Sequence, residues 1–515
     1  MKHTVKLFSA LLALLLSLSL IACGAPDMGG NEAGGKDSTM NGNDQNAGGS
    51  PSYDGLIPNG GNDPGTGGTG TEGFVENPFI ATAEQNVSTF SADVDTASYS
   101  YFRKLVNKGY TLSQLKQNSI AFRTEEFLNY FKYDLPEPYE SALFGARADL
   151  FDTPWSTSTV LLRLSLQAPT AVNTEGNNLV FLIDVSGSMS SADKLPLLKH
   201  GFLQLAESLD ANDTVSIVTY SGKEQVVLDG CRGNDTARIL NAINSLTAYG
   251  STNGEAGLNR AYEIAQKHRI TGGNNRIIMA SDGDLNVGIT SEAELERFVA
   301  EKRQSGIYLS VMGFGTGNYR DAKMETLADH GNGVYYYVDG ESEVEKVMGT
   351  DLFGTLYTVA EDVKLQLTFD PAKVSSYRLI GYENRLLNEE DFNDDTKDAG
   401  EVGAGHAVTV FYELTLAEGA RTSSTPLMKL AVRYKEPGSD SSLLNEYNIG
   451  MQNYTAAPSD DLRFMVAVIQ TTMILHNSKY VGGATLDGIV ETLEGMDLSR
   501  TPDRAEFLAL LKKLT

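Results

Sequence analysis

The residues best suited to bind a ligand form one short turn, from Asp184 to Ser188. The apolar run 179–183 leads directly into this turn, which predicts a buried strand that ends on a carboxylate. Ser186 and Ser188 stand at alternate positions, and Gly187 between them allows the chain to turn tightly. One carboxylate and two hydroxyls of this kind suit a hard, octahedral cation. The turn therefore predicts a Mg²⁺ site, with Mn²⁺ or Ca²⁺ as the alternatives.

Two later segments offer further oxygen ligands. The small-residue loop 249–254 comes just before a predicted helix and contains the hydroxyl of Thr252. The apolar run 277–280 predicts another buried strand, and Asp282 stands where that strand ends. In open α/β sheets, ligands bind beyond the carboxyl ends of the strands. The candidate metal ligands are therefore Asp184, Ser186, Ser188, Thr252 and Asp282.

The region that must position these ligands alternates strand-like and helical patterns from about residue 178 to 358. Strands are predicted at 179–183, 215–220, 225–228, 276–280, 308–314 and 333–338. Helices are predicted at 194–209, 235–245, 254–267, 291–304, 321–330 and 341–358. Such alternation predicts a doubly wound α/β domain with a mainly parallel sheet.

The flanking regions have different patterns. Apolar and polar residues alternate at 363–369 and in parts of 406–416 and 428–434, and 160–166 is another short strand candidate. This period of two is typical of half-buried antiparallel strands. We expect a β-sandwich-like region built from both flanks, with the α/β domain inserted between them. Residues 460–476 and 486–514 return to helical spacing, and Thr501 and Pro502 mark the start of the last helix.

With these residues, the chain resembles a von Willebrand factor type A domain that carries a metal-ion-dependent adhesion site. The pattern of that site is Asp-x-Ser-x-Ser, then a distant Thr and a distant Asp. The resemblance implies that Ser186, Ser188 and Thr252 contact the ion directly or nearly so. It also implies that Asp184 and Asp282 hold the ion, often through water. Two acids leave a divalent site close to neutral, and an open sixth position favours a carboxylate from a partner protein.

One departure from the pattern concerns a second ion. Integrin-type domains use an adjacent pair of acids for it, and here Ser191 and Ala192 replace that pair, with Asp193 one place late. We therefore expect a single ion. Ser191 and Lys194 also satisfy the Ser-x-x-Lys pattern of penicillin-recognising enzymes, but their other motifs are not found as a set. We interpret Lys194 as a lysine on a solvated helix face.

The resemblance extends beyond the α/β region to a bacterial family of type A lipoproteins. Segments 77–79, 88–99, 125–131 and 154–155 resemble its N-terminal region, and 377–385 and 398–406 resemble its C-terminal domain, which has no assigned function. The similarity covers about 76–515. The predicted organisation is a signal peptide (1–22), a tether (23–75), an N-terminal family region (76–175), the type A domain (176–358), a β-rich C-terminal domain (359–457) and a helical segment (458–515).

The N-terminus indicates export and anchoring. Lys2 and Lys6 precede an apolar stretch that ends at Ile21, which is typical of a secretory signal. Residues 20–23, Leu-Ile-Ala-Cys, resemble the lipobox of bacterial lipoproteins, which implies that Cys23 is diacylated. The alternative is an uncleaved membrane anchor with an incidental cysteine. In 24–75, 16 of 52 residues are glycine, so this segment predicts a flexible tether that spans roughly 40 Å.

Composition and the remaining motifs argue against the binding of nucleic acids and of dinucleotides. The net charge of −26 argues against nucleic-acid binding, which needs a basic face. Cys231 is the only cysteine besides Cys23, so we expect a buried, inert thiol and no intrachain disulfide. The glycine-rich run 313–317 lacks the third glycine of a dinucleotide loop and predicts a sharp loop beside the metal site. Residues 335–337, all tyrosine, predict a buried strand end.

Together these features predict a non-catalytic lipoprotein, anchored outside the cytoplasm to the outer face of the cell membrane or to an outer membrane. It would bind a protein partner through a metal-bridged carboxylate. The alternative is a cell-envelope assembly or chaperone-like factor that uses the same metal site for transient client binding. A hydrolase with a site near Asp398 or His406 has least support, because the sequence shows no nucleophile–base pair.

Overall fold

The computed structural model describes residues 74–139, 142–170, 175–251, 254–283, 292–315, 321–352, 354, 357–499 and 501–515. The chain divides into the units Met1–Gly60 and Gly61–Thr515, and every described residue belongs to the second. Cys23, almost all of the predicted tether and Thr252 lie outside the described residues. Within the described ranges, none of the helices is long and apolar enough to cross a membrane.

The α/β domain is built on a sheet that, in the described chain, has six strands in the order β10-β9-β8-β5-β6-β7. All neighbouring strands are parallel except β6 and β7. The direction of the strand order reverses at β5 and β8, which is where doubly wound sheets bind ligands. The predicted doubly wound, mainly parallel sheet is confirmed. Its strands are β5 (Asn177–Asp184), β6 (Thr214–Tyr220), β7 (Glu224–Arg232), β8 (Asn274–Ser281), β9 (Tyr308–Phe314) and β10 (Tyr335–Val338).

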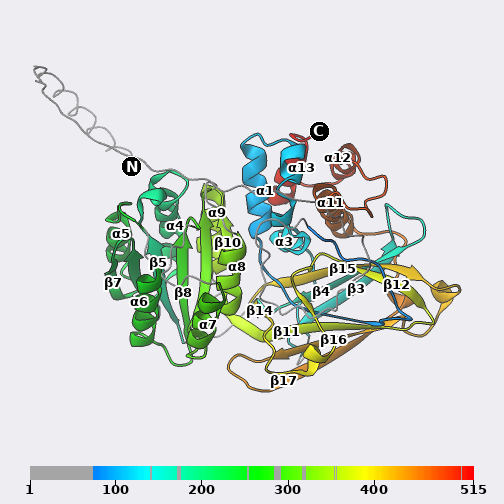
Figure 1. Ribbon diagram of the computed structural model, residues 1–515, viewed down its shortest axis with the longest axis horizontal. Helices are drawn as coiled ribbons and strands as arrows, with labels where there is room; N and C mark the ends of the chain where they lie inside the picture. Colours follow the sequence, from blue (N-terminus) through cyan, green and yellow to red (C-terminus); the bar gives the residue numbers. More distant parts are fainter. Residues whose placement is uncertain are drawn as a thin grey trace, which may run out of the picture. The chain divides into compact units, whose positions relative to one another are not determined.

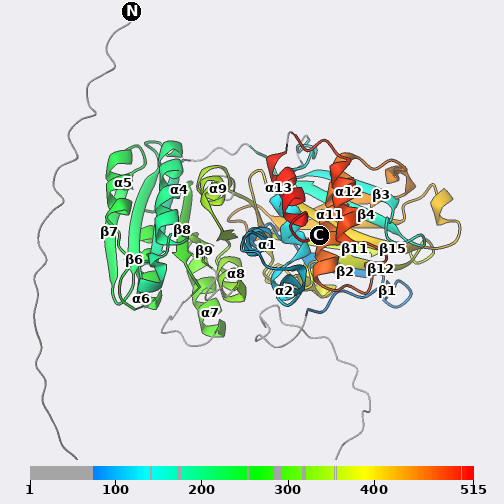
Figure 2. The same cartoon turned by 90° about the horizontal axis from the view of Figure 1, so that it is seen from above.

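Helices cover both faces of this sheet, so β5 is buried along its whole length. Phe181 and Ile183 point to one apolar cluster, and Val180 and Leu182 point to the other. Figure 2 shows α4 (Leu195–Ser208), α5 (Thr236–Asn244) and α9 (Glu341–Lys346) on one face, and α6 (Gly254–Lys267), α7 (Glu292–Arg303) and α8 (Asp321–His330) on the other.

The predicted helix 341–358 is too long. Helix α9 ends at Lys346 and continues into a π-helical turn, Val347–Asp351, and Thr358 already opens strand β11. Thr358 and Ala360 pair with Gly403 and Val402 of β14, so sheet pairing overrides the helical spacing of the sequence.

The flanks of the α/β domain together form two antiparallel sheets, as expected. In the described residues one sheet has the order β1-β12-β15-β4-β3, and the other has β13-β2-β11-β16-β17 with β14 paired to β11. The N-terminal strand β4 pairs with the C-terminal β15, and β2 pairs with β11. The strands are β1 (Ile80–Ala81), β2 (Val87–Ser91), β3 (Gly145–Asp152), β4 (Val160–Gln167), β11 (Thr358–Phe369), β12 (Val374–Ile380), β13 (Leu386–Leu387), β14 (Gly400–Gly403), β15 (Ala407–Leu416), β16 (Met428–Lys435) and β17 (Ser442–Ile449).

A helical layer from both ends of the chain accompanies these sheets (Figure 1). Its aromatic centre joins α1 to α13, since the rings of Tyr99 and Phe507 are 6.1 Å apart. The predicted run 486–514 is two helices, and the last one begins at Pro502 as predicted. The helices are α1 (Ala97–Asn107), α2 (Leu112–Lys116), α3 (Thr124–Tyr130), α11 (Asp460–Leu475), α12 (Leu486–Glu494) and α13 (Pro502–Leu511).

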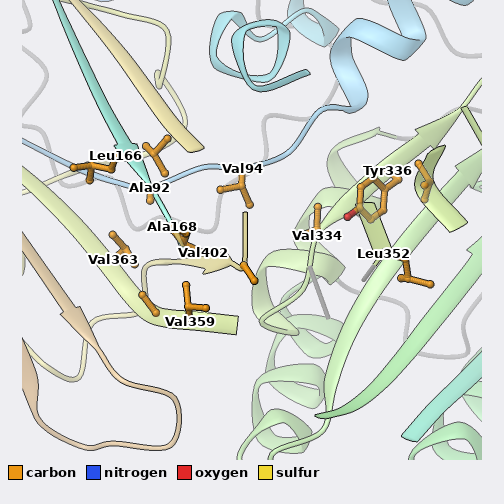
Figure 3. Packing of buried hydrophobic residues seen from close by; sticks show 14 of the residues in the cluster. Ala92, Val94, Leu166, Ala168, Val334, Tyr336, Leu352, Val359, Val363 and Val402 are labelled. Carbon is orange, nitrogen blue, oxygen red and sulfur yellow. The ribbon is translucent and has the colours of Figure 1, made fainter. Parts of the chain in front are cut away.

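The apolar core runs without a break from the α/β domain into the sandwich. Figure 3 shows Val334 and Tyr336 of the α/β domain in the same buried cluster as Val94, Val359 and Val402 of the sandwich region. Each of these side chains is at most 8% exposed. Burial of such a junction stabilises the two parts against each other.

Candidate functional site

The predicted turn lies at the carboxyl end of β5, where the carboxyl group of Asp184 is fully buried. The Ser186 amide donates to Asp184 Oδ1 at 2.8 Å, and the Ser281 hydroxyl donates to Oδ2 at 3.5 Å. The hydroxyls of Ser186 and Ser188 are 2.9 Å apart. The structure thus brings one carboxylate and two hydroxyls together, as the sequence predicted. Their binding of a metal stays a prediction.

The loop that leads to Thr252 is docked on this turn. The Tyr249 amide donates to the Val185 carbonyl at 2.7 Å, and the Gly187 amide donates to the Gly250 carbonyl at 3.1 Å. These two bonds fix the loop as far as Gly250 beside the Asp184 turn. Thr252 itself lies outside the described residues, so its role as a ligand stays a prediction.

Asp282 lies at the neighbouring strand end. Strand β8 pairs with β5 in register, Ala280 opposite Ile183, and Asp282 follows the last residue of β8. Its side chain is 2% exposed, and the Lys194 ammonium donates to its Oδ2 at 2.8 Å. The same ammonium donates to the Ser188 carbonyl at 2.9 Å. The interpretation of Lys194 as a residue on a solvated helix face is therefore wrong. Helix α4 begins at Leu195, so Lys194 lies before the helix, and the spacing of a solvated helix face does not place its side chain.

The electrostatics of the site favour a cation. Burial, together with the nearby Asp282, raises the pKa of Asp184 to about 6, although the amide and hydroxyl of Ser186 oppose the shift. Two buried carboxylates at adjacent strand ends are costly unless positive charge compensates them. Among the described residues, the candidate metal-ligating atoms are all oxygens, and they come from Asp184, Ser186, Ser188 and Asp282. They fit a hard divalent ion.

Asp193, the acid that stands one place late, has other partners. Its Oδ1 accepts from the Ser191 hydroxyl at 2.6 Å, and its Oδ2 accepts from the Lys104 ammonium of α1 at 3.0 Å. Burial opposes ionisation, but these two donors hold the pKa of Asp193 at about 2. Both carboxylate oxygens are thus engaged within the protein, and the expectation of a single ion stays a prediction.

A second group of acids lies where the α/β domain meets the sandwich. Asp362, Asp398 and Glu401 place ligand atoms within 4.8 Å of one another. Arg303 of α7 pairs with Asp398 at 2.7 Å, and Lys435 of β16 pairs with Asp362 at 2.5 Å. These two cations neutralise much of the acidic charge. We interpret the cluster as an ion-pair junction between α7, β11 and β16, a contact that no local sequence pattern could indicate.

Three family profiles match successive parts of the chain. They are described as von Willebrand factor (residues 70–163), von Willebrand factor type A domain (178–350) and uncharacterized protein YfbK, C-terminal (354–515). The uncharacterized protein YfbK of Escherichia coli (strain K12) is 39% identical over 468 residues, which cover 85% of this chain and 80% of that protein. The chain belongs to the YfbK family of von Willebrand factor type A proteins. The resemblance noted in the sequence is confirmed for the type A and C-terminal domains.

Two other proteins similar to this YfbK family member match a smaller part of the chain. The human inter-alpha-trypsin inhibitor heavy chain H3 is 28% identical over 275 residues, which are 49% of this chain but only 30% of that one. The solved structure of a von Willebrand factor type A protein from Catenulispora acidiphila is 17% identical and covers 74% of this chain and 88% of its own, with a TM-score of 0.41. Type A domains typically mediate protein interactions and commonly bind a divalent metal.

Proposed function

We propose that this protein is a non-catalytic, surface-anchored lipoprotein that captures a protein partner through a metal-bridged carboxylate. The ion, Mg²⁺ or else Mn²⁺ or Ca²⁺, would be held by Asp184, Ser186, Ser188, Thr252 and Asp282. The observation that carries the proposal is the pair of buried carboxylates at adjacent strand ends, beside two hydroxyls 2.9 Å apart.

The arrangement suits ligand capture in two respects. Asp184 is oriented by the Ser186 amide and the Ser281 hydroxyl, so its carboxylate is set in place before any ligand arrives. Among the described residues, two at the outer rim of the site are exposed, Ser188 and Tyr249, and Tyr249 is 61% exposed. When bound, the divalent ion would act as a Lewis acid with a coordination position free for a carboxylate of the partner.

The first test replaces Asp184 by Asn, which keeps the size of the side chain but removes its charge. The control is Asp229→Asn, a carboxylate of the same domain that pairs with Lys267 and His268 at 2.6 Å. We expect calorimetry on EDTA-treated protein to show one Mg²⁺ bound to the wild type and to Asp229→Asn. Asp184→Asn should bind none, and its surface crosslinks to the partner should disappear.

Two results would change this proposal. Capture of the partner by Asp184→Asn in the presence of EDTA would refute the metal-bridged mechanism. Transient crosslinks to many envelope proteins, instead of one stable complex, would favour the chaperone-like factor.

The anchor is a separate part of the proposal. Cys23 in the lipobox-like sequence would be diacylated, and 24–75 would hold the folded part away from the membrane surface, outside the cytoplasm. Labelled fatty acid should be incorporated into the wild type and into Cys231→Ser, but not into Cys23→Ser. Equal labelling of Cys23→Ser would contradict lipidation at this position.

A further inference from the structure

Lys194 is the cation that contacts the candidate metal site within the described structure. Its ammonium donates to Asp282 Oδ2 at 2.8 Å and to the Ser188 carbonyl at 2.9 Å. It therefore joins the turn after β5 to the end of β8, the two segments that supply the predicted ligands. Lys194 comes ten positions after Asp184 and belongs to neither segment.

The fold makes room for this side chain. Gly315, at the end of β9, has a φ of +79°, and a Cβ at this position would lie 2.4 Å from Lys194 Cε. A larger residue at 315 would thus collide with the lysine stem. The Lys194 side chain is only 15% exposed, so its path into the site is enclosed by the ends of three neighbouring strands, β5, β8 and β9.

The charges around Lys194 indicate the effect of its contact with Asp282. Asp184 and Asp282 are buried acids, and Lys194 compensates one of the two negative charges. A divalent ion that is bound by Asp282 and an ammonium that is bound by Asp282 repel each other, and this repulsion is strong where water is largely excluded. Lys104 of α1 is paired with Asp193 at 3.0 Å. Among the described residues, Lys194 is the cation that contacts a predicted ligand, so its charge opposes the ion directly.

We infer that Lys194 is a built-in competitor of the metal ion: its ammonium pairs with Asp282 and must release that carboxylate before a divalent cation can bind. The inference rests on the proposed metal site. It adds a residue that sets how tightly the site holds its ion, and hence at what divalent concentration partner capture begins.

The test uses Lys194→Met, which keeps the aliphatic stem beside Gly315 and removes the charge. Mg²⁺ and Mn²⁺ alone are titrated into EDTA-treated full-length protein by calorimetry, and folding is checked by circular dichroism. We expect Lys194→Met to bind Mg²⁺ about tenfold more tightly than the wild type, which corresponds to about 1.4 kcal/mol. Lys194→Gln, which retains a hydrogen-bond donor, should show the same direction and serves if Lys194→Met does not fold.

The matched control is Lys199→Met on α4, the helix that follows Lys194. The Lys199 ammonium donates to the carbonyls of Asn244 and Leu246, away from the site, so its loss should leave Mg²⁺ affinity unchanged. Equal or weaker Mg²⁺ binding by both Lys194 variants, with binding by the wild type intact, would overturn this inference alone. Absence of binding in the wild type and in every variant would overturn the proposed metal site and the inference with it. Binding by the Lys194 variants but not by the wild type would support the inference.

Discussion

Replacement of Arg103 by Met should destabilise the folded unit more than any surface substitution. This guanidinium, 5% exposed, extends from α1 to the segment after β10. It donates to both oxygens of Asp339 at 2.6 and 2.7 Å, and to Glu343 Oε2 at 2.6 Å. It also donates to the Tyr130 hydroxyl at 2.7 Å and to Glu506 at 3.0 Å. One cation therefore compensates three acids from two parts of the chain, the segment 339–343 and helix α13.

The expected cost follows from burial. Without Arg103, the side chains of Asp339 and Glu343, 7% and 2% exposed, lose their cation, and breaking a buried pair in this way costs about 3–5 kcal/mol. Glu506 is 39% exposed and adds at most about 1 kcal/mol. Folded proteins unfold with about 2.1 cal/mol/K of entropy per residue, so for roughly 440 residues a loss of about 4 kcal/mol lowers Tm by about 4 °C.

Urea unfolding followed by tryptophan fluorescence measures this effect. Trp155 is the sole tryptophan, and its indole donates to Glu413 of the sandwich at 3.3 Å. Glu506→Gln, which removes only the exposed partner, should remain within about 0.5 kcal/mol of the wild type. Adding Glu343→Gln to Arg103→Met should restore part of the loss, because it removes one of the buried charges. A loss below about 1 kcal/mol for Arg103→Met, or no recovery in the double variant, would refute the reasoning.

Two further predictions concern buried reactive groups. Burial and the neighbouring Glu383 raise the pKa of Glu125 to about 8, above its ordinary value of 4.5, so the folded state holds a proton that the unfolded state loses. Stability should therefore fall as pH rises from 5 to 8. Glu125→Gln should gain about 1.4 kcal/mol relative to the wild type per pH unit in that window, measured by urea titration, and parallel pH profiles would contradict this. The Cys231 thiol, 1% exposed, should react with a thiol reagent only after unfolding when Cys23 is replaced by Ser; fast labelling of the native protein would contradict its burial.

Much of the α/β domain could be predicted because its elements are buried on one or both faces. Strand β9 and helices α6 and α8 have the predicted bounds, since uninterrupted apolar runs and regular helical spacing follow directly from burial. The buried strand end at residues 335–337 is confirmed for the same reason. The predicted end of the helix 341–358 was wrong. Strand β11 pairs with β14, which is distant in sequence, and this pairing makes the chain a strand from Thr358 onward.

The sequence by itself determined the Asp184 turn, because its carboxylate and two hydroxyls lie within five consecutive residues. It also indicated that Asp282 lies near them, since strand ends share one edge of a doubly wound sheet. The tertiary structure alone decided which cations meet these acids. Lys194 and Asp282 are 88 residues apart, and Arg103 and Asp339 are 236 apart. Long, flexible cationic side chains leave no periodic signal in the sequence, so only packing shows which carboxylate each one pairs with.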